Sequence, residues 1–187
     1  MSEIVISSVT TTRQTEIDWL YRGVGRFFPE QWERFLAGAP GMPRDGNIVA
    51  AYAHLAEDPD AAVRERATAD WCAWEDAVLS GETKGTAVYG GRPPAARLAL
   101  VRICSHYFAH GAWLEDGELL REAHRLAGIP GVLIHGRLDM GGPLDTAWQL
   151  ARAWPDAELT VVEDAGHLGN EAEVNHVLDT LNRFTAR

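Results

Sequence analysis

The sequence predicts an α/β fold in which about three parallel strands are interrupted by a long, mostly helical insertion. Near the C-terminus, two β-rich runs at 131–135 and 158–163 alternate with helical sequence, which is the pattern of a parallel sheet. A third apolar run, Ile4-Val5-Ile6, opens the chain, and helical sequence follows it over 14–126. In an open α/β sheet such an insertion is expected to cap the carboxyl ends of the strands, where ligands bind.

The first part of the chain predicts one strand and two helices. Residues 3–9 form a β-branched run that ends in serine and threonine, as a short buried strand does. Residues 14–38 carry apolar side chains at helical spacing, and Phe27-Phe28-Pro29 divides them into two helices. The proline stands at an early position of the second helix, where its missing N–H costs no hydrogen bond.

The middle of the chain predicts four further helices, at 47–56, 60–79, 94–110 and 114–126. Glycine and proline mark the loops at 38–46 and 80–93. The clearest helix is 60–79, whose apolar side chains recur with a period close to 3.6 residues. These are Val63, Ala67, Trp71, Trp74 and Val78.

The last part predicts strand, helix, strand and helix, with the final helix at 171–186. The predicted organisation is therefore a first core strand in 1–12, a helical cap in 13–127, and the C-terminal part of the core in 128–187.

Composition excludes several classes of function. The chain has 187 residues, a net charge of −10 and an isoelectric point near 5.1, which argues against a nucleic-acid or anionic-membrane partner. We see no apolar stretch long enough to span a membrane and no secretion signal, so we expect a cytoplasmic protein with Cys72 and Cys104 as reduced thiols. No metal-ligand cluster or phosphate loop is present, and we expect no cofactor.

An acid and a histidine follow the last two predicted strands. Asp139 stands in a turn just after 131–135, and His167 stands in the turn Asp-Ala-Gly-His just after 158–163. This is the order in which the acid and the base of a Ser-Asp-His triad occur in α/β-hydrolases. The alternatives are an ordinary helix-capping aspartate and an ordinary loop histidine. The spacing and the turns together favour the triad.

Four stretches of sequence resemble the C-terminal part of the proline iminopeptidases, which are α/β-hydrolases with a helical cap. They are Trp71-Cys72-Ala73-Trp74-Glu75, the segment from Arg102 to Phe108, the acid turn that ends at Asp139, and the segment from Ala153 to His167. The resemblance implies a partial α/β-hydrolase fold and release of an N-terminal residue, preferentially proline, from peptides. Asp139 and His167 would then be catalytic residues.

The same resemblance implies a binding site for the free amine of the substrate. Glu75, with Trp74 beside it, matches one acid of this site. Cys104 stands where the family motif has the second acid, which weakens strict specificity for proline. The alternatives are a surface glutamate for Glu75 and a small buried side chain for Cys104.

The family's nucleophile elbow and oxyanion loop have no match in this sequence. Ser7, Ser8, Ser105 and Cys104 are the candidate replacements, but Ser7 and Ser8 lack the flanking glycines that a strained elbow needs. Two hypotheses follow. In the first, the chain is a fragment that supplies acid, base and cap for a peptide or amide substrate and is inactive alone. In the second, it is a non-catalytic remnant whose exposed sheet edge is covered by a second chain or by a homo-oligomer.

Overall fold

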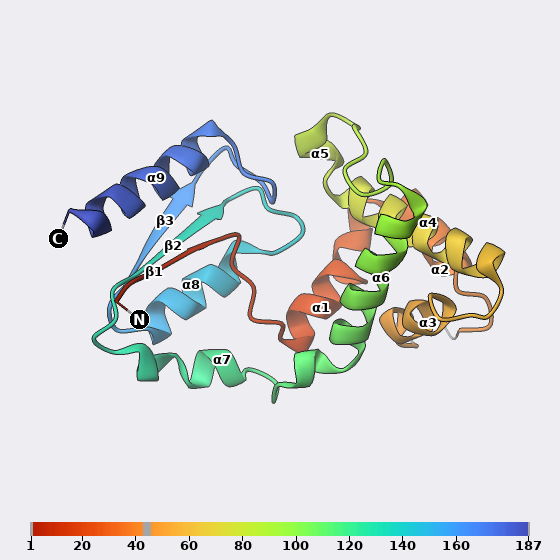
Figure 1. Ribbon diagram of the computed structural model, residues 1–187, viewed down its shortest axis with the longest axis horizontal. Coiled ribbons are helices and arrows are strands. Elements are labelled where there is room, and N and C mark those ends of the chain that lie inside the picture. Colours follow the sequence, from red (N-terminus) through yellow and green to blue (C-terminus); the bar gives the residue numbers. More distant parts are fainter. Residues whose placement is uncertain (1, 43–45, 187) are drawn as a thin grey trace. The chain divides into compact units, whose positions relative to one another are not determined.

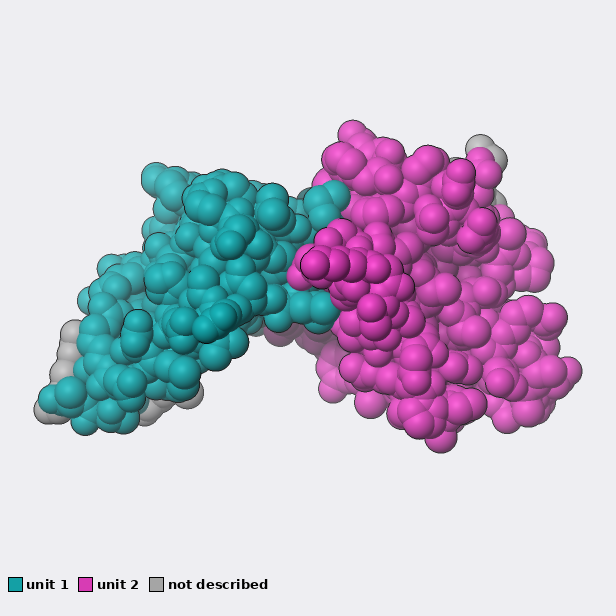
Figure 2. Space-filling model, turned by 90° about the horizontal axis from the view of Figure 1, so that it is seen from above, with its two compact units in different colours: residues 1–16, 115–187 teal, residues 17–114 magenta. Residues whose placement is uncertain are grey.

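A computed structural model describes residues 2–42 and 46–186 of the chain. The chain divides into two compact units, one made of residues 1–16 and 115–187 and the other of residues 17–114 (Figure 2). The first unit contains the sheet and the second is helical. Among the described residues, no helix has the length and apolar character needed to cross a bilayer.

The sheet of the first unit has three parallel strands in the order β1-β2-β3 (Figure 1). They are β1 (Ile4–Ser7), β2 (Gly131–Gly136) and β3 (Ala157–Val162). In register, Val5 lies opposite Val132, and Val132 lies opposite Glu158. The predicted α/β class is confirmed, and the arrangement is consistent with a partial α/β-hydrolase fold.

Helices cover both faces of this sheet. Helix α8 (Leu144–Ala153) lies on one face and α9 (Glu171–Thr185) lies on the other (Figure 1). Because successive strand residues point to opposite faces, each face has its own core. The α8 side buries Leu133, Ala147, Leu150 and Trp154. The α9 side buries Val132, Ile134, Val162 and Ala165, with Val177 and Phe184 packed against them.

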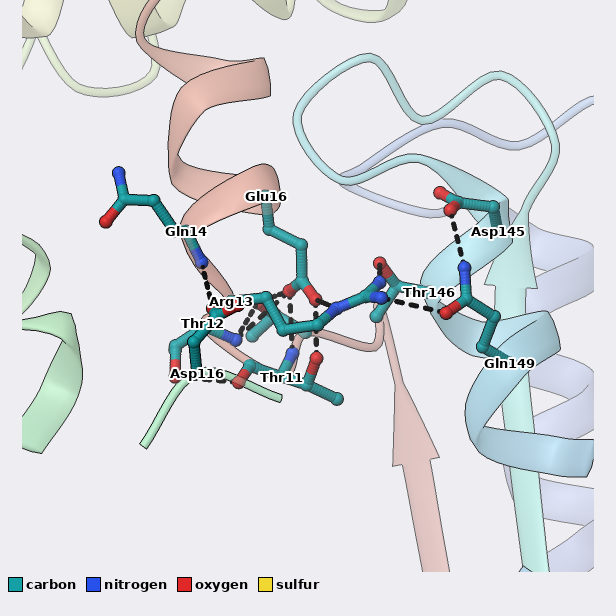
Figure 3. Close-up of polar contacts among 10 residues, drawn as sticks. Thr11, Thr12, Arg13, Gln14, Glu16, Asp116, Asp145, Thr146 and Gln149 are labelled. Carbon is teal, nitrogen blue, oxygen red and sulfur yellow. Dashed lines mark hydrogen bonds and ion pairs between the residues drawn. The ribbon is translucent and has the colours of Figure 1, made fainter. Parts of the chain in front are cut away.

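The segment after β1 is held by the carboxylate of Glu16. Glu16 accepts hydrogen bonds from the Thr11 and Thr12 N–H groups at 2.8 and 3.1 Å, and also from the hydroxyls of Thr10 and Thr11 (Figure 3). The Arg13 Nε–H also donates a hydrogen bond to Glu16 Oε1, at 2.8 Å. Burial by itself would raise the pKa of Glu16, but these hydrogen bonds outweigh it and hold the pKa below its ordinary value.

This network also ties the segment to α8 and to the returning chain. Arg13 donates to Gln149 Oε1 at 2.8 Å and to Thr146 Oγ1 at 3.2 Å, both on α8 (Figure 3). The Gln14 N–H donates to Asp116 Oδ1 at 2.8 Å. Residues 10–16 and 116, where the chain leaves and re-enters the first unit, are therefore fixed within that unit.

The second unit is a helical bundle around stacked aromatic rings. Phe35 stacks on Tyr52 and on Trp74, with ring centroids 4.5 and 5.5 Å apart, and Trp71 lies 4.6 Å from Tyr21. Its helices are α1 (Gln14–Leu20), which begins in the first unit, α2 (Pro29–Ala37), α3 (Ile48–Leu55), α4 (Ala61–Val78), α5 (Ser80–Thr83) and α6 (Pro94–Ala109). The 3₁₀ turns Gly23–Arg26 and Gly111–Trp113 complete it.

Two segments differ from the sequence-based expectation. The expected helix at 114–126 consists of α7 (Glu118–Arg121) followed by the 3₁₀ turn Ala123–Leu126. Gly117 precedes α7 with φ of 73°, a left-handed conformation that no α-helix continues through. The expected loop at 80–93 begins with the single turn of α5.

Candidate active site

The structure brings Asp139 and His167 together at one edge of the sheet. Asp139 lies in the loop after β2, and His167 lies in the loop after β3. Because parallel strands place their carboxyl ends at the same edge, the two loops meet there. His167 Nδ1 lies 3.1 Å from Asp139 Oδ2, and since a carboxylate only accepts, the imidazole donates the Nδ1 proton.

The two side chains differ in exposure, as expected for an acid that only supports the histidine and a base that must reach the substrate. The Asp139 side chain is 1% exposed, whereas the His167 side chain is 36% exposed. The other carboxylate oxygen of Asp139, Oδ1, accepts the Gly142 N–H at 2.8 Å. The carboxylate is thus held inside the protein by its own loop and directs one oxygen at His167.

A second histidine lies beside Asp139. His135, on β2, is fully buried, and its Nε2 is 3.6 Å from Asp139 Oδ2. Its Nδ1 accepts the Val9 N–H at 3.0 Å, and its Nε2 donates to the Gly142 carbonyl at 2.7 Å. No motif in the sequence predicts a site role for His135. Its position inside an apolar strand could have pointed to a role, because a buried polar ring needs hydrogen-bond partners.

The end of β1 holds the His167 loop. The Ser8 hydroxyl donates to the His167 carbonyl oxygen at 3.0 Å, and Ser8 has a φ of 53°, which is uncommon for a residue with a side chain. The Ser7 hydroxyl donates to Glu173 Oε1 at the start of α9. Both hydroxyls are therefore used by the backbone or by a carboxylate.

Glycines allow the two loops to approach closely. A Cβ atom at Gly136 would overlap the Ala165 carbonyl and lie 2.7 Å from the Gly166 oxygen, both in the turn before His167. A Cβ atom at Gly141 would lie 3.3 Å from Asp139 Oδ1 and from His167 Nδ1. The close packing of the His167 turn on β2 therefore requires glycine at position 136, and a side chain at position 141 would contact both Asp139 and His167 tightly.

In the helical unit, aromatic donors orient Glu75. Glu75 Oε1 accepts the Tyr21 hydroxyl at 2.7 Å and the Trp71 indole N–H at 2.8 Å. Burial and the charge of Glu75 raise the pKa of Tyr21 well above its ordinary value, so this hydroxyl stays a donor. Glu75 is a preorganised carboxylate rather than a loosely held surface side chain.

The other two predicted amine-site residues lie in the same unit. Cys104, on α6, is half-buried, and burial together with the charge of Glu75 raises the pKa of its thiol to about 11. Trp74 is buried in the aromatic core, and its indole donates to the Leu20 carbonyl at 3.0 Å. The roles of Glu75, Trp74 and Cys104 in binding an amine remain predictions.

Within residues 2–42 and 46–186, no three His, Cys, Asp or Glu side chains gather in a way that suits a metal ion. The chemistry that the site residues offer is proton transfer at His167 and attraction of a cation at Glu75.

Comparison with known proteins gives one consistent family name. No protein-family model matches the chain. It is 43% identical over 171 residues to a probable proline iminopeptidase of Streptomyces coelicolor and 37% identical over 174 residues to a proline iminopeptidase of Xylella fastidiosa. A probable proline iminopeptidase of Leptolyngbya boryana is 34% identical over 187 residues.

These matches cover 89%, 92% and 98% of this chain but 52%, 55% and 58% of the relatives. The chain therefore spans about half the length of the curated relatives it matches. The similarity includes nearly all of both structural units.

Proposed function

Because homologues named proline iminopeptidase match about nine-tenths of this chain, we propose that it carries the acid and the base of a serine aminopeptidase. The reaction would release an N-terminal residue, preferentially proline, from a peptide or amide. The contact between Asp139 and His167, at the edge where parallel sheets place their sites, is the observation that supports this most strongly.

The proposed steps follow from the geometry of this pair. A serine Oγ attacks the carbonyl carbon of the first residue, and His167 Nε2 takes the serine proton. The imidazolium then gives that proton to the leaving amine, which leaves an acyl-enzyme, and water hydrolyses the ester by the same route. Asp139 holds Nδ1–H and stabilises the positive imidazolium.

In this proposal the serine and the oxyanion donors come from residues outside these 187. Three observations support that assignment. The Ser7 hydroxyl donates to Glu173, and the Ser8 hydroxyl donates to a backbone carbonyl. The Cys104 thiol, with a pKa of about 11, is protonated at neutral pH and is a poor nucleophile.

We assign the free amine of the substrate to Glu75. Its carboxylate is oriented by Tyr21 and Trp71, and aromatic walls suit an ammonium group. With Cys104 in place of a second acid, one charge-assisted hydrogen bond is absent. In an active form, Cys104→Glu should raise kcat/KM for prolyl amides by about 10- to 100-fold, since such a bond is worth about 1.5–3 kcal/mol.

A non-catalytic, partner-binding role is the second candidate. Among the described residues, β1 pairs on one side with β2 and has no strand on its other side. An edge of this kind pairs readily with another strand. Two results together would favour this role: a stable dimer of the chain in solution, seen by light scattering, and no hydrolysis by the chain when it is combined with the missing half of a relative.

A chimera tests the proposed function. The 187-residue chain replaces the matching half of the Streptomyces coelicolor relative, and release of p-nitroaniline from prolyl p-nitroanilide is measured. The proposal expects turnover by the chimera, loss of turnover on His167→Ala, and no turnover by the chain alone. A folded chimera that shows no turnover would contradict the proposal, and so would clear turnover by the pure chain.

A further inference from the structure

We propose that His135 is a positioning residue for Asp139: it ties the acid loop to the end of β1 so that the carboxylate faces His167. The inference rests on the proposed function, because positioning has a catalytic meaning only if Asp139 serves His167. It is carried by a continuous series of hydrogen bonds within the first unit.

This series begins just after β1, at Val9, and ends at the acid. The Val9 N–H donates to His135 Nδ1 at 3.0 Å, and His135 Nε2–H donates to the Gly142 carbonyl at 2.7 Å. The Gly142 N–H then donates to Asp139 Oδ1 at 2.8 Å. His135 thus holds the peptide group next to the one that fixes the carboxylate.

Only one state of the His135 ring fits these contacts. Since Nδ1 accepts an N–H, it carries no proton, and Nε2 carries the proton that goes to Gly142. The imidazole is therefore neutral. Its Nε2 lies 3.6 Å from Asp139 Oδ2, beyond hydrogen-bond reach, so His135 does not take the oxygen that His167 uses.

Few side chains can replace this one. The site needs an acceptor toward Val9 and a donor toward Gly142 on one rigid, fully buried ring. Val9 is itself buried, so its N–H would be left without a partner if the acceptor were removed. Phenylalanine fills a similar volume but offers neither. Glutamine places an N–H near the imidazole Nε2 position, and asparagine places an oxygen near the Nδ1 position.

The tautomers of both histidines can be measured in the 187-residue chain itself. Two-bond ¹H–¹⁵N correlation spectra of ¹⁵N-histidine-labelled protein show which ring nitrogen carries the proton. We expect Nε2–H for His135 and Nδ1–H for His167 in the wild type. Nδ1–H at His135 in the wild type would overturn the proposal without any variant.

The variants separate positioning from packing. His135→Phe should release the fixed Nδ1–H form of His167 into a mixture of tautomers, while His135→Gln retains it. His135→Asn replaces His135→Phe if that variant does not fold, and it should also lose the Nδ1–H form. Leu150→Ala, a core truncation on α8, is the control that lowers stability but leaves the His167 tautomer unchanged. Retention of Nδ1–H by folded His135→Phe or His135→Asn would overturn the proposal.

The chimera adds a kinetic readout. His135→Phe should lower kcat about 10- to 100-fold with little change in KM, because a small misplacement of a catalytic group costs this much. An active chimera whose kcat is unchanged by His135→Phe would overturn the positioning role. If the unmodified chimera shows no turnover, the proposed function fails, and the tautomer spectra still decide whether His135 orients Asp139.

Discussion

His167 Nδ1 lies 3.1 Å from Asp139 Oδ2, although the two residues are 28 positions apart and belong to different loops. Neither loop is held by this contact alone. Ser8 bonds the backbone of His167, and Gly142 bonds the carboxylate of Asp139. Residues of this chain alone therefore hold both loops in the positions that bring Asp139 and His167 into contact.

Asp139→Asn tests the role of the acid. The amide of asparagine can donate to Nδ1, which would force the proton onto Nε2 and prevent His167 from acting as a base. We expect kcat of the chimera to fall by about 10⁴ with the fold intact. Steady-state kinetics beside circular dichroism measure this. A fall of less than about tenfold would argue against the assigned role.

Glu16→Gln should destabilise the chain by about 1–3 kcal/mol at pH 7, because several hydrogen bonds end on this carboxylate. The pKa of Glu16 is lowered in the folded state, so its contribution is present above the unfolded value of 4.5 and is lost as pH falls through the folded value. Denaturant titrations at pH 7 and pH 3 should show that the difference in unfolding free energy between the wild type and Glu16→Gln is smaller at pH 3.

Glu158→Gln is the matched control for this prediction. Glu158 forms an exposed ion pair with Arg183 at 3.0 Å, which contributes less than about 1 kcal/mol. Equal losses in the two variants would contradict a special role of the Glu16 network.

Gly136→Ala should destabilise the protein by about 1–3 kcal/mol or more, since the added methyl group meets backbone atoms that cannot move aside. Gly81→Ala is the control, because nothing lies within 4 Å of a Cβ atom at that position. Denaturation midpoints of both variants decide the matter. A neutral Gly136→Ala would mean that the His167 turn is loosely packed on β2.

Ser8→Ala and Ser8→Gly separate backbone strain from hydrogen bonding. Both lose the bond to the His167 carbonyl, worth about 0.5–1.5 kcal/mol. Glycine also relieves the positive φ of 53°, worth about 1–2 kcal/mol. We therefore expect Ser8→Gly to be more stable than Ser8→Ala in thermal unfolding. The reverse order would show that the positive φ at Ser8 carries no cost that glycine relieves.

Cys104 and Cys72 should both resist alkylation in the folded chain at pH 8. Burial, with the nearby Glu75 carboxylate, raises their pKa values to about 11 and about 12, so the thiolate fraction is small. Mass spectrometry after iodoacetamide treatment, with and without denaturant, measures this. Rapid labelling of Cys104 in the native state would renew its candidacy as a nucleophile.

Most of the fold could be predicted from local sequence. The expected strands at 3–9, 131–135 and 158–163 correspond to β1, β2 and β3, because β-branched runs between turn residues are a strong local signal. The prediction of one helix over 114–126 was wrong in its extent. Its apolar spacing is helical, but a left-handed Gly117 and short turns occupy much of it.

The candidate site could be predicted only in part. Asp139 and His167 follow from their turns and from the order of strands, whereas His135 was given no site role. Its partners lie 126 positions away at Val9 and 7 away at Gly142, and no local pattern reports such contacts. The Ser8 bond to His167 spans 159 positions and was hidden for the same reason.

The sequence by itself determined the α/β class, the parallel strands and the two residues that bear the proposed proton transfer. These follow from side-chain periodicity and turn chemistry, which act over a few neighbouring residues. The tertiary structure alone decided how those residues are held: the Nε2–H state of His135, the left-handed Ser8 and the Glu16 network. Each depends on hydrogen bonds between segments that meet only when the sheet forms, and a buried polar group takes whichever partner the fold brings to it.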